Sequence, residues 1–220
     1  MKVHTFKQYS DSWWAARRGR PSASRFGDIL QPVKMQLGKG AESYACELIG
    51  DLLDMNYGPK DEFATSAMRS GTVMEPHIRR YYEFQRDIEV QEVGLCESDD
   101  GRFTGSPDGL CADDGVLELK HPTPKVQIKY LLDGGVPAEY LGQVHGHLIV
   151  TGRKWVDFLS YVPGLPELLI RVEPDGYTEK LAIALDEFWD LFTNMKAQII
   201  GQPDAVRDHA IAGANYVSPF

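Results

Sequence analysis

Residues 105–120 read GSPDGLCADDGVLELK, and this stretch decides the fold of the chain. Its apolar end, residues 116–120, predicts a β-strand, in which successive side chains point to opposite faces. Glu118 and Lys120 are two positions apart and therefore share one face, whereas the leucines beside them share the other. The pattern predicts an apolar strand that carries a charged pair on one side.

A second carboxylate lies upstream on the same hairpin. Asp108 falls on the strand before a turn at residues 112–115, which brings it close to Glu118 and Lys120. Carboxylates bind Mg²⁺, which takes hard oxygen ligands and keeps waters and substrate phosphates around it. An ammonium beside such a metal can orient or deprotonate a water. The three side chains therefore predict metal-assisted phosphodiester hydrolysis.

An ordinary explanation also exists for each half of this pattern. Asp-Gly is a common hairpin turn, and Glu-x-Lys on a strand is usually a solvent-exposed pair. The Ser-Pro-Asp-Gly run upstream and the apolar flanks favour the hydrolytic site over that explanation.

The composition is that of a globular chain. Its 220 residues suit one domain, and 43% hydrophobic with 25% charged residues suits a soluble one. We expect a single nuclease domain over residues 1–220, with residues 201–220 as a tail or an oligomer contact. No apolar run approaches the roughly 18 residues that span a bilayer, and the N-terminus has no apolar signal core. We therefore expect a cytoplasmic protein without membrane contact.

The net charge of −9 favours an acidic enzyme with a small-molecule substrate over a DNA-binding protein. However, the charge is uneven, because four arginines gather early, at positions 17, 18, 20 and 25. A local basic patch is enough to hold a phosphate backbone. Both interpretations stay open on charge alone.

Three cysteines, Cys46, Cys96 and Cys111, are spread along the chain. Their odd number and wide spacing suggest neither a disulfide framework nor a zinc site. The absence of a CxxC pair argues against an iron–sulfur cluster. We predict that all three are small buried hydrophobic residues.

Periodicity and chain breakers predict the remaining elements as helices around a mixed sheet, which is an α/β (α+β) architecture. Helices are expected from about Ser10 to Arg17 and over residues 22–30, 41–57, 66–84, 125–132, 138–150 and 178–196. Strands are expected over residues 88–95, 103–105, 116–120, 155–161 and 168–172, with the first two paired. Pro76 implies that the helix over residues 66–84 begins near Met74 or bends.

Several polar residues on these helices have two explanations each. Glu75 lies on an apolar face, where it binds a metal, pairs with a cation or caps a turn at Pro76. Ser22 or Ser24 at a helix start, with Arg17, can hold a phosphate or be a plain cap. Gln143 and His147 lie four positions apart on one face. No role follows for His77, His121 or His147.

The order of these pieces resembles the lambda exonuclease family, the YqaJ-type viral recombinases of the restriction-endonuclease-like group. The resemblance covers most of residues 10–195. Its motifs are an arginine with Gly-x-x-x-Ala-Ser, then Gly-x-x-x-Glu, Ser-Pro-Asp-Gly, Leu-Glu-Leu-Lys and Gln-Val-x-x-x-Leu. His121 and the segment around residues 41–63 depart from the family pattern.

The resemblance implies roles at the hydrolytic centre. Asp108 and Glu118 would hold the metal, with the backbone carbonyl of Leu119 as a further ligand. Glu75 would approach the metal directly or through water. Lys120 would position or activate the attacking water.

Further roles concern the DNA. Gln143 would orient groups around the site or bind the phosphate. Arg17 and Ser24 would grip the 5′-phosphate of the digested strand. Met68 would be an apolar wedge that parts the duplex end, or else a core residue.

The activity implied is a Mg²⁺-dependent 5′→3′ exonuclease on double-stranded DNA ends, with Mn²⁺ able to substitute. It would release 5′-mononucleotides and leave a 3′ overhang for recombination by strand annealing. The resemblance also implies a processive homotrimeric ring, a single-strand annealing protein as partner, and a phage or prophage origin in a bacterial host cell. Two alternatives stay open: a restriction- or repair-type endonuclease on the same core, and a non-catalytic DNA-end-binding module.

Overall fold

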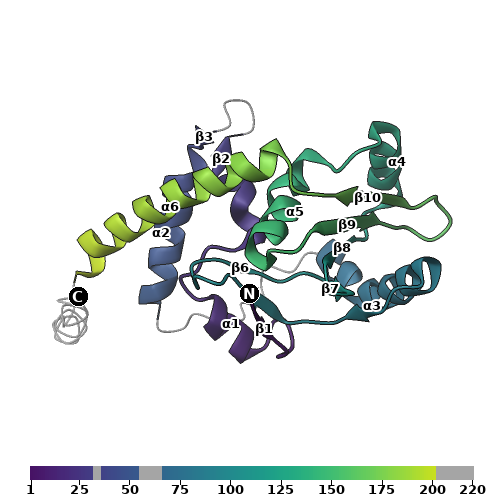
Figure 1. Cartoon of the computed structure of the whole chain (residues 1–220), viewed down its shortest axis with the longest axis horizontal. Coiled ribbons are helices and arrows are strands. Elements are labelled where there is room, and N and C mark those ends of the chain that lie inside the picture. Colours follow the sequence, from purple (N-terminus) through teal and green to yellow (C-terminus); the bar gives the residue numbers. More distant parts are fainter. Residues whose placement is uncertain (32–35, 55–65, 202–220) are drawn as a thin grey trace, which may run out of the picture.

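The computed structural model describes residues 1–31, 36–54 and 66–201, and a mixed five-stranded sheet lies at the centre of this part (Figure 1). The strands lie in the order β10–β9–β8–β7–β4. Their bounds are β4 Val90–Gln91, β7 Gly109–Cys111, β8 Gly115–Lys120, β9 Trp155–Ser160 and β10 Leu168–Val172. Within this sheet β8 and β9 run parallel, whereas the other neighbouring pairs are antiparallel. The predicted class, a mixed sheet with flanking helices, is confirmed.

The central strand β8 is the apolar end of residues 105–120, as predicted. It forms a tight hairpin with β7, in which Cys111 lies opposite Gly115. On its other edge it pairs with β9, and Leu117 lies opposite Asp157. Strands that run between two neighbours and under helices are buried on both faces. Accordingly, every residue of β8 before Lys120 is buried.

Helices cover the two faces of β8 as its side-chain alternation requires. On one face, Val116 packs in a core with residues of α5 (Ala138–Thr151). On the other face, Leu117 and Leu119 pack with residues of α3 (Ser66–Arg86). Glu118 and Lys120 have the same parity as Val116, so they point toward α5 and not toward α3.

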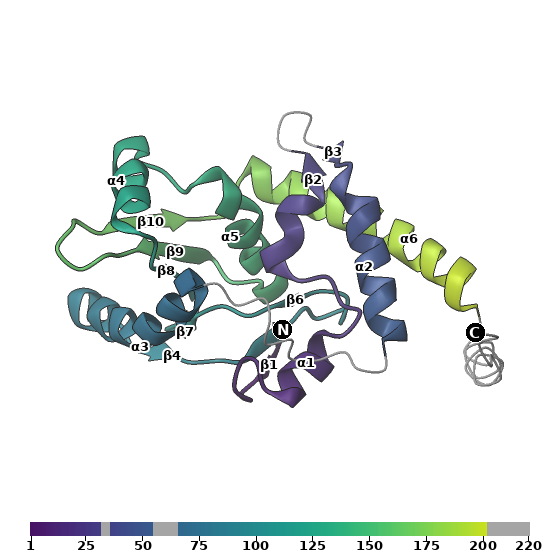
Figure 2. The ribbon, with the colours of Figure 1, turned by 180° about the vertical axis from the view of Figure 1, so that it is seen from behind.

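A second group of elements surrounds the far side of α5 (Figure 2). The antiparallel strands β1 (Lys2–His4), β5 (Leu95–Glu97) and β6 (Thr104–Gly105) form a small sheet. The other elements of this group are α1 (Asp11–Arg17), the 3₁₀ helix η1 (Ala23–Asp28), β2 (Leu30–Gln31), β3 (Gln36–Leu37), α2 (Gly40–Leu53) and α6 (Gly176–Ile200). Helix α4 (Pro124–Asp133) lies instead beside β9, where Gln127 Nε2 donates to the Ser160 carbonyl at 3.1 Å.

Close packing holds this group against α5. A Cβ atom at Gly142 would lie 2.4 Å from the backbone nitrogen of Gly27, so that only glycine lets η1 approach the helix. The rings of Tyr44 and Phe188 stack at 5.5 Å and join α2 to α6. η1 and α5 therefore lie in direct contact beside the end of β8.

Three helix ends carry residues that suit helix termini. Gly134 and Gly152 end α4 and α5 with left-handed φ angles of 71° and 64°, a conformation that costs glycine little. Asp175 and Thr178 form a capping box at the start of α6. None of the described helices combines the length and the apolar content that a bilayer span requires.

Several local predictions are wrong. The segment 22–30 forms a six-residue 3₁₀ helix, and the Ser22 side chain makes no capping bond. The single strand expected over residues 88–95 is divided, because β4 pairs with β7 whereas β5 pairs with β6. The backbone turns between them at Gly94, where a Cβ atom would lie 1.8 Å from the Phe6 carbonyl oxygen.

Two further predictions are also corrected. Helix α3 (Ser66–Arg86) confirms the helix expected over residues 66–84, but it continues through Pro76 and does not start near Met74. Cys96 and Cys111 are buried as expected, but Cys46 is exposed on α2. The tail predicted over residues 201–220 lies, from residue 202 on, outside the described residues.

Candidate active site

A cleft with a volume of about 570 Å³ opens beside the C-terminal end of β8. Its wall contains every predicted site residue whose side chain the structure describes. They are Arg17, Ser24, Glu75, Asp108, Glu118, Leu119, Lys120 and Gln143. The fold thus brings together α1, η1, α3, α5 and the β7–β8 hairpin. The predicted wedge, Met68, belongs to α3, but its side chain lies outside the described residues.

The charged pair of β8 consists of a buried Glu118 and a partly buried Lys120. Lys120 Nζ donates hydrogen bonds to Glu118 Oε1 at 2.6 Å and to Gln143 Oε1 at 3.3 Å. It also lies 4.6 Å from the ring centroid of Tyr140 on α5, within range of a cation–π contact. The Glu118 side chain is 2% exposed. The pair is therefore not the solvent-exposed pair that Glu-x-Lys usually forms.

Asp108 closes the open end of the β7–β8 hairpin. It lies directly before β7, and its N–H donates to the Leu117 carbonyl at 3.1 Å. Its Oδ2 accepts a hydrogen bond from the Leu119 N–H at 2.6 Å. The Asp108 carboxylate thus replaces the backbone partner that Leu119 lacks beyond the first residue of β7, and it lies at the same end of β8 as Glu118.

The backbone carbonyl of Leu119 faces the cleft side of β8. Successive carbonyl groups of a strand point to opposite edges. The Lys120 carbonyl accepts from Tyr161 N–H on the β9 side, so the Leu119 carbonyl points toward the β7 side. There the chain before Asp108 is Pro107, which has no N–H to donate. This carbonyl is therefore placed to bind an external group.

The pKa values of the two carboxylates Asp108 and Glu118 are shifted in opposite directions. Burial raises the pKa of Asp108 well above its usual range, and the carboxylates of Glu118 and Glu75 raise it further. Burial also raises the pKa of Glu118, but Lys120 and His147 lower it to about 2 overall. Burial lowers the pKa of Lys120, whereas Glu118 and Asp108 raise it above its usual value. One carboxylate is thus ionised beside an ammonium, and the other resists ionisation.

The donor set fits a divalent cation with oxygen ligands. Asp108, Glu118 and the Leu119 carbonyl supply the hard oxygens that Mg²⁺ prefers. A cation would relieve the carboxylate repulsion that raises the pKa of Asp108. Among the described residues, no group of three His, Cys, Asp or Glu side chains is arranged to hold a metal ion by itself. Backbone, water and substrate would complete the shell, as is usual for Mg²⁺.

Glu75 reaches the cleft from α3, where Arg79 holds it. The Arg79 guanidinium donates to Glu75 Oε1 at 2.6 Å, to Glu92 Oε2 at 2.7 Å and to the Asp108 carbonyl at 2.9 Å. Burial raises the pKa of Glu75, although Arg79 opposes the shift. Glu75 is thus paired with a cation and does not cap a turn at Pro76. Arg79 was not among the predicted site residues, although its i, i+4 spacing from Glu75 was an available signal.

His147 is the second residue of the site for which the sequence predicts no role. It lies one turn after Gln143 on α5, and its Nε2 is 2.9 Å from Glu118 Oε2. Both side chains are buried. The spacing of Gln143 and His147 signalled a shared face, but only the packing of α5 on the sheet shows that this face meets Glu118 and Lys120. His121 also lines the cleft, and its Nδ1 is 2.8 Å from the Tyr161 carbonyl oxygen.

The early arginines separate in the fold and do not form one basic patch. Of the four, Arg17 lines the cleft, and its guanidinium lies 4.4 Å from the Trp13 ring centroid. The other three bind elsewhere: Arg18 to the Asp51 and Leu52 carbonyls, Arg20 to Glu97, and Arg25 to Asp28 and Glu47. An anion in the cleft would therefore meet Arg17 and the exposed hydroxyl of Ser24.

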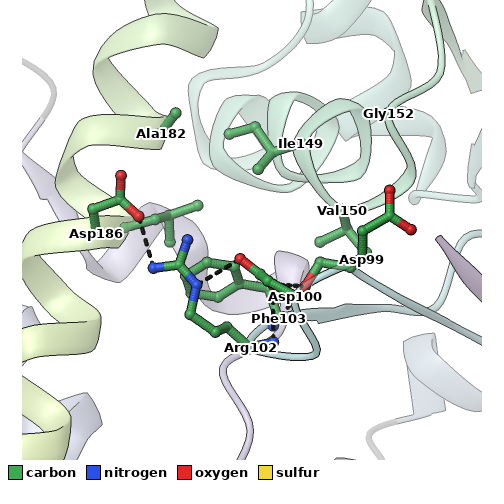
Figure 3. A pocket seen from close by; sticks show the side chains of 11 residues that line it. Asp99, Asp100, Arg102, Phe103, Ile149, Val150, Gly152, Ala182 and Asp186 are labelled. Atoms are coloured by element: carbon green, nitrogen blue, oxygen red, sulfur yellow. Dashed lines mark hydrogen bonds and ion pairs between the residues drawn. The ribbon is translucent and has the colours of Figure 1, made fainter.

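A second hollow, of about 300 Å³, lies between the β5–β6 turn, α5 and α6 (Figure 3). Arg102 bridges it, donating to Asp100 at 2.6 Å and to Asp186 at 2.7 Å. No predicted site residue with a described side chain lines this hollow. The charged side chains of this hollow connect the β5–β6 turn to α6. They do not converge on one place, as the charged side chains of the cleft do.

The comparison with protein families agrees with this geometry. Residues 12–154, more than half of the chain, match the YqaJ-like viral recombinase domain. No curated protein matches the chain by sequence.

Solved structures extend the comparison. An alkaline exonuclease, LHK-Exo from Laribacter hongkongensis, is 30% identical with a TM-score of 0.70, over 86% of this chain and 97% of that one. Its complex with dAMP matches equally well. A phage-related exonuclease from Haemophilus somnus 129PT, 15% identical with a TM-score of 0.55 over 80% and 96% of the chains, shares the fold. The chain therefore belongs to the YqaJ-like viral recombinases of the lambda exonuclease family and is a nuclease with the restriction-endonuclease-like fold.

Proposed function

We propose that this nuclease is a Mg²⁺-dependent exonuclease that digests one strand of a DNA duplex from its 5′ end. It would release 5′-mononucleotides and leave a 3′ single-stranded overhang. The observation that carries the proposal is the cleft in which Asp108, Glu118 and Lys120 meet Arg17 and Ser24. A hydrolytic centre beside phosphate ligands suits a strand whose end is held while the next phosphodiester is cut. The likeness to an alkaline exonuclease that binds dAMP, a nucleoside monophosphate, supports it.

Asp108, Glu118 and the Leu119 carbonyl would hold Mg²⁺ or Mn²⁺, with Glu75 acting directly or through water. When bound, the cation supplies Lewis-acid polarisation of the phosphate and a lowered pKa for water. Arg79 favours the ionised form of Glu75 and holds its carboxylate near this point, because it donates to both Glu75 and the Asp108 carbonyl.

Lys120 would act as a hydrogen-bond donor in the reaction. Because Glu118 and Asp108 raise its pKa, its Nζ stays protonated at neutral pH. It can then orient the attacking water and stabilise the charge that develops on the phosphate. Gln143 and Tyr140 contact the ammonium and limit its movement. Such charges act more strongly in a partly buried cleft than in open water.

Arg17 and Ser24 would bind the 5′-phosphate. The planar guanidinium matches two phosphate oxygens at once, and the hydroxyl of Ser24 can donate to a third. The contact with Trp13 holds the Arg17 side chain along the cleft wall. Met68, on the same helix as Glu75, stays our candidate for the wedge at the duplex end.

The family also supports proposals about context. We expect one nuclease domain over residues 1–220, a homotrimeric ring around DNA, and an annealing protein that receives the 3′ strand. A ring would reconcile a net charge of −9 with DNA binding, since its lumen can be basic while its outer surface is acidic. We place the protein in the cytoplasm of a bacterial host, encoded by a phage or prophage.

The decisive assay compares linear duplex DNA that carries a 5′-phosphate or a 5′-hydroxyl with covalently closed circles. We expect mononucleotide release from the phosphorylated end, no cutting of circles, and loss of activity in EDTA. Cutting of circles would favour an endonuclease. Metal-independent binding without cleavage would favour a DNA-end-binding module.

The polarity is tested by Arg17→Ala, with Arg25→Ala as the matched control. Arg17→Ala should slow digestion of phosphorylated ends by about 10-fold or more, because a hydrogen bond to a charged group contributes about 1.5–3 kcal/mol. The rate of digestion from hydroxyl ends should not change. Arg25 pairs with Asp28 and Glu47 outside the cleft, so its removal should change neither rate. Equal slowing of both ends by Arg17→Ala would contradict a 5′-phosphate site.

A further inference from the structure

The Glu118 carboxylate is held from two sides by two different elements. From its own strand, Lys120 Nζ donates to Oε1 at 2.6 Å. From α5, His147 Nε2 lies 2.9 Å from Oε2. The side chains of Glu118 and His147 are 2% and 1% exposed, so bulk water does not replace either partner. The orientation of this carboxylate therefore depends on α5 as much as on β8.

The surroundings of His147 determine which of its nitrogens carries the proton. A carboxylate paired with an ammonium only accepts hydrogen bonds, so Nε2 of His147 must donate. The other nitrogen, Nδ1, is buried and has no hydrogen-bond partner within the described part of the chain. A proton there would be a buried donor without an acceptor, which is unfavourable. The geometry therefore selects the tautomer with its proton on Nε2.

The His147 ring packs closely against β6, where only glycine leaves room for it. Gly105 of β6 lies behind the ring, and a Cβ atom there would come within 3.0 Å of Nδ1. One turn earlier on the same face of α5, Gln143 contacts Lys120. The helix thus places one side chain against each member of the Glu118–Lys120 pair, and both contacts stabilise the same arrangement.

We propose that His147 is a positioning residue for the metal ligand Glu118. By donating its Nε2–H to Oε2, it fixes the rotamer of the carboxylate so that the free lone pairs face Asp108 and the Leu119 carbonyl. This inference rests on the proposed metal-dependent function. Removing such an outer partner typically weakens metal affinity by about 10–100-fold. His147 touches neither metal nor DNA in this role.

Three substitutions test the proposal in the full chain. His147→Leu keeps the bulk but removes the donor, whereas the amide of His147→Gln can still donate to Glu118. His145→Gln is the matched control. His145 is also a buried histidine of α5, but it contacts the Thr178 hydroxyl and no residue of the cleft. Thermal unfolding in EDTA establishes that each variant is folded.

Calorimetric titration with Mg²⁺ and Mn²⁺ gives the first result, independent of cleavage. We expect His147→Leu to bind about 10–100-fold more weakly, and His147→Gln and His145→Gln to stay within about 3-fold of the wild type. In digestion assays, the Mg²⁺ concentration for half-maximal activity should rise for His147→Leu by the same factor. A merely structural histidine would lower the unfolding temperature without this rescue by glutamine.

A nitrogen-15 NMR spectrum of the imidazole groups in the metal-free protein gives the second result. We expect the His147 proton on Nε2, and an Nε2 without a proton overturns the proposal. Wild-type affinity in folded His147→Leu also overturns it. A wild-type protein that binds neither cation would instead refute the metal-dependent function itself, so the two failures are distinguishable.

Discussion

The cleft at the end of β8 and the hollow around Arg102 both combine cations with carboxylates, but in opposite environments. In the hollow, Arg102 joins Asp100 and Asp186, whose side chains are 45% and 64% exposed. In the cleft, Lys120 pairs with Glu118, whose side chain is 2% exposed. Water screens the first set, whereas burial strengthens every attraction and repulsion in the second.

The pKa values of two aspartates show what this difference does. For Asp100 in the hollow, burial raises the pKa, but Ser98 and Arg102 lower it below its usual value overall. For Asp108 in the cleft, burial and two neighbouring carboxylates raise the pKa together. Charges in the hollow are satisfied by each other, whereas those of the cleft need a further cation. Unsatisfied charge of this kind is typical of functional sites.

The largest effect is expected when the Lys120 ammonium is removed from the cleft. Lys120→Ala should lower the rate of DNA digestion by about 10²–10³-fold or more, because it removes a donor aimed at the developing charge. Binding to a duplex end should change little, since Arg17 and Ser24 are intact. Fluorescence anisotropy with a labelled duplex and a gel-based digestion assay measure the two quantities. Digestion within 10-fold of the wild type would refute this role.

The second-largest effect is expected when the Arg79 guanidinium, which lies behind the cleft, is removed. Arg79→Ala leaves the Glu75 carboxylate and the Asp108 carbonyl without their buried partner. We expect the free energy of unfolding to fall by about 3 kcal/mol, as when one member of a buried pair is lost. Urea denaturation measures it. A loss below about 0.5 kcal/mol would show that water replaces the guanidinium.

Neutralising Asp108 should change the free energy of unfolding by less, and in the opposite direction. Asp108 has a raised pKa in the folded state, so its contribution to stability is present below the unfolded pKa of about 3.9 and is lost as pH rises through the folded pKa. At neutral pH in EDTA, Asp108→Asn should therefore stabilise the protein by about 1–2 kcal/mol while it abolishes digestion. Thermal unfolding from pH 4 to pH 8 tests both the sign and the window. An unchanged or lower unfolding temperature would contradict it.

The smallest effect belongs to the hollow. Arg102→Ala should lower the free energy of unfolding by less than about 1 kcal/mol, and about 1 M NaCl should remove most of the difference. Digestion should proceed at the wild-type rate. A loss as large as that of Arg79→Ala would mean that exposure does not separate the two regions.

Much of the site could be predicted because it depends on spacing along the chain. The alternation in β8 placed Glu118 and Lys120 on one face, and the hairpin turn returned Asp108 to the same strand end. Helical spacing put Gln143 and His147 on one face of α5. These relations follow from backbone geometry, which a short segment contains in full.

The relations that could not be predicted join elements distant in the sequence. Nothing near Arg79 shows that its guanidinium reaches the Asp108 carbonyl, and nothing near His147 shows that it meets Glu118. The early arginines looked alike in the sequence, yet only Arg17 among them lines the cleft in the described structure. Cys46 looked like the other cysteines but lies on the exposed face of its helix.

The sequence by itself determined which groups stand on which face of each strand and helix, and with them the nuclease motif of residues 105–120. The tertiary structure decided which faces meet and how deeply they are buried. Burial sets the strength of every charge interaction, because desolvation and low dielectric depend on atoms contributed by the whole fold. Hence the identity of Asp108 and Glu118 as carboxylates is local, whereas their opposite pKa shifts belong to the assembled cleft.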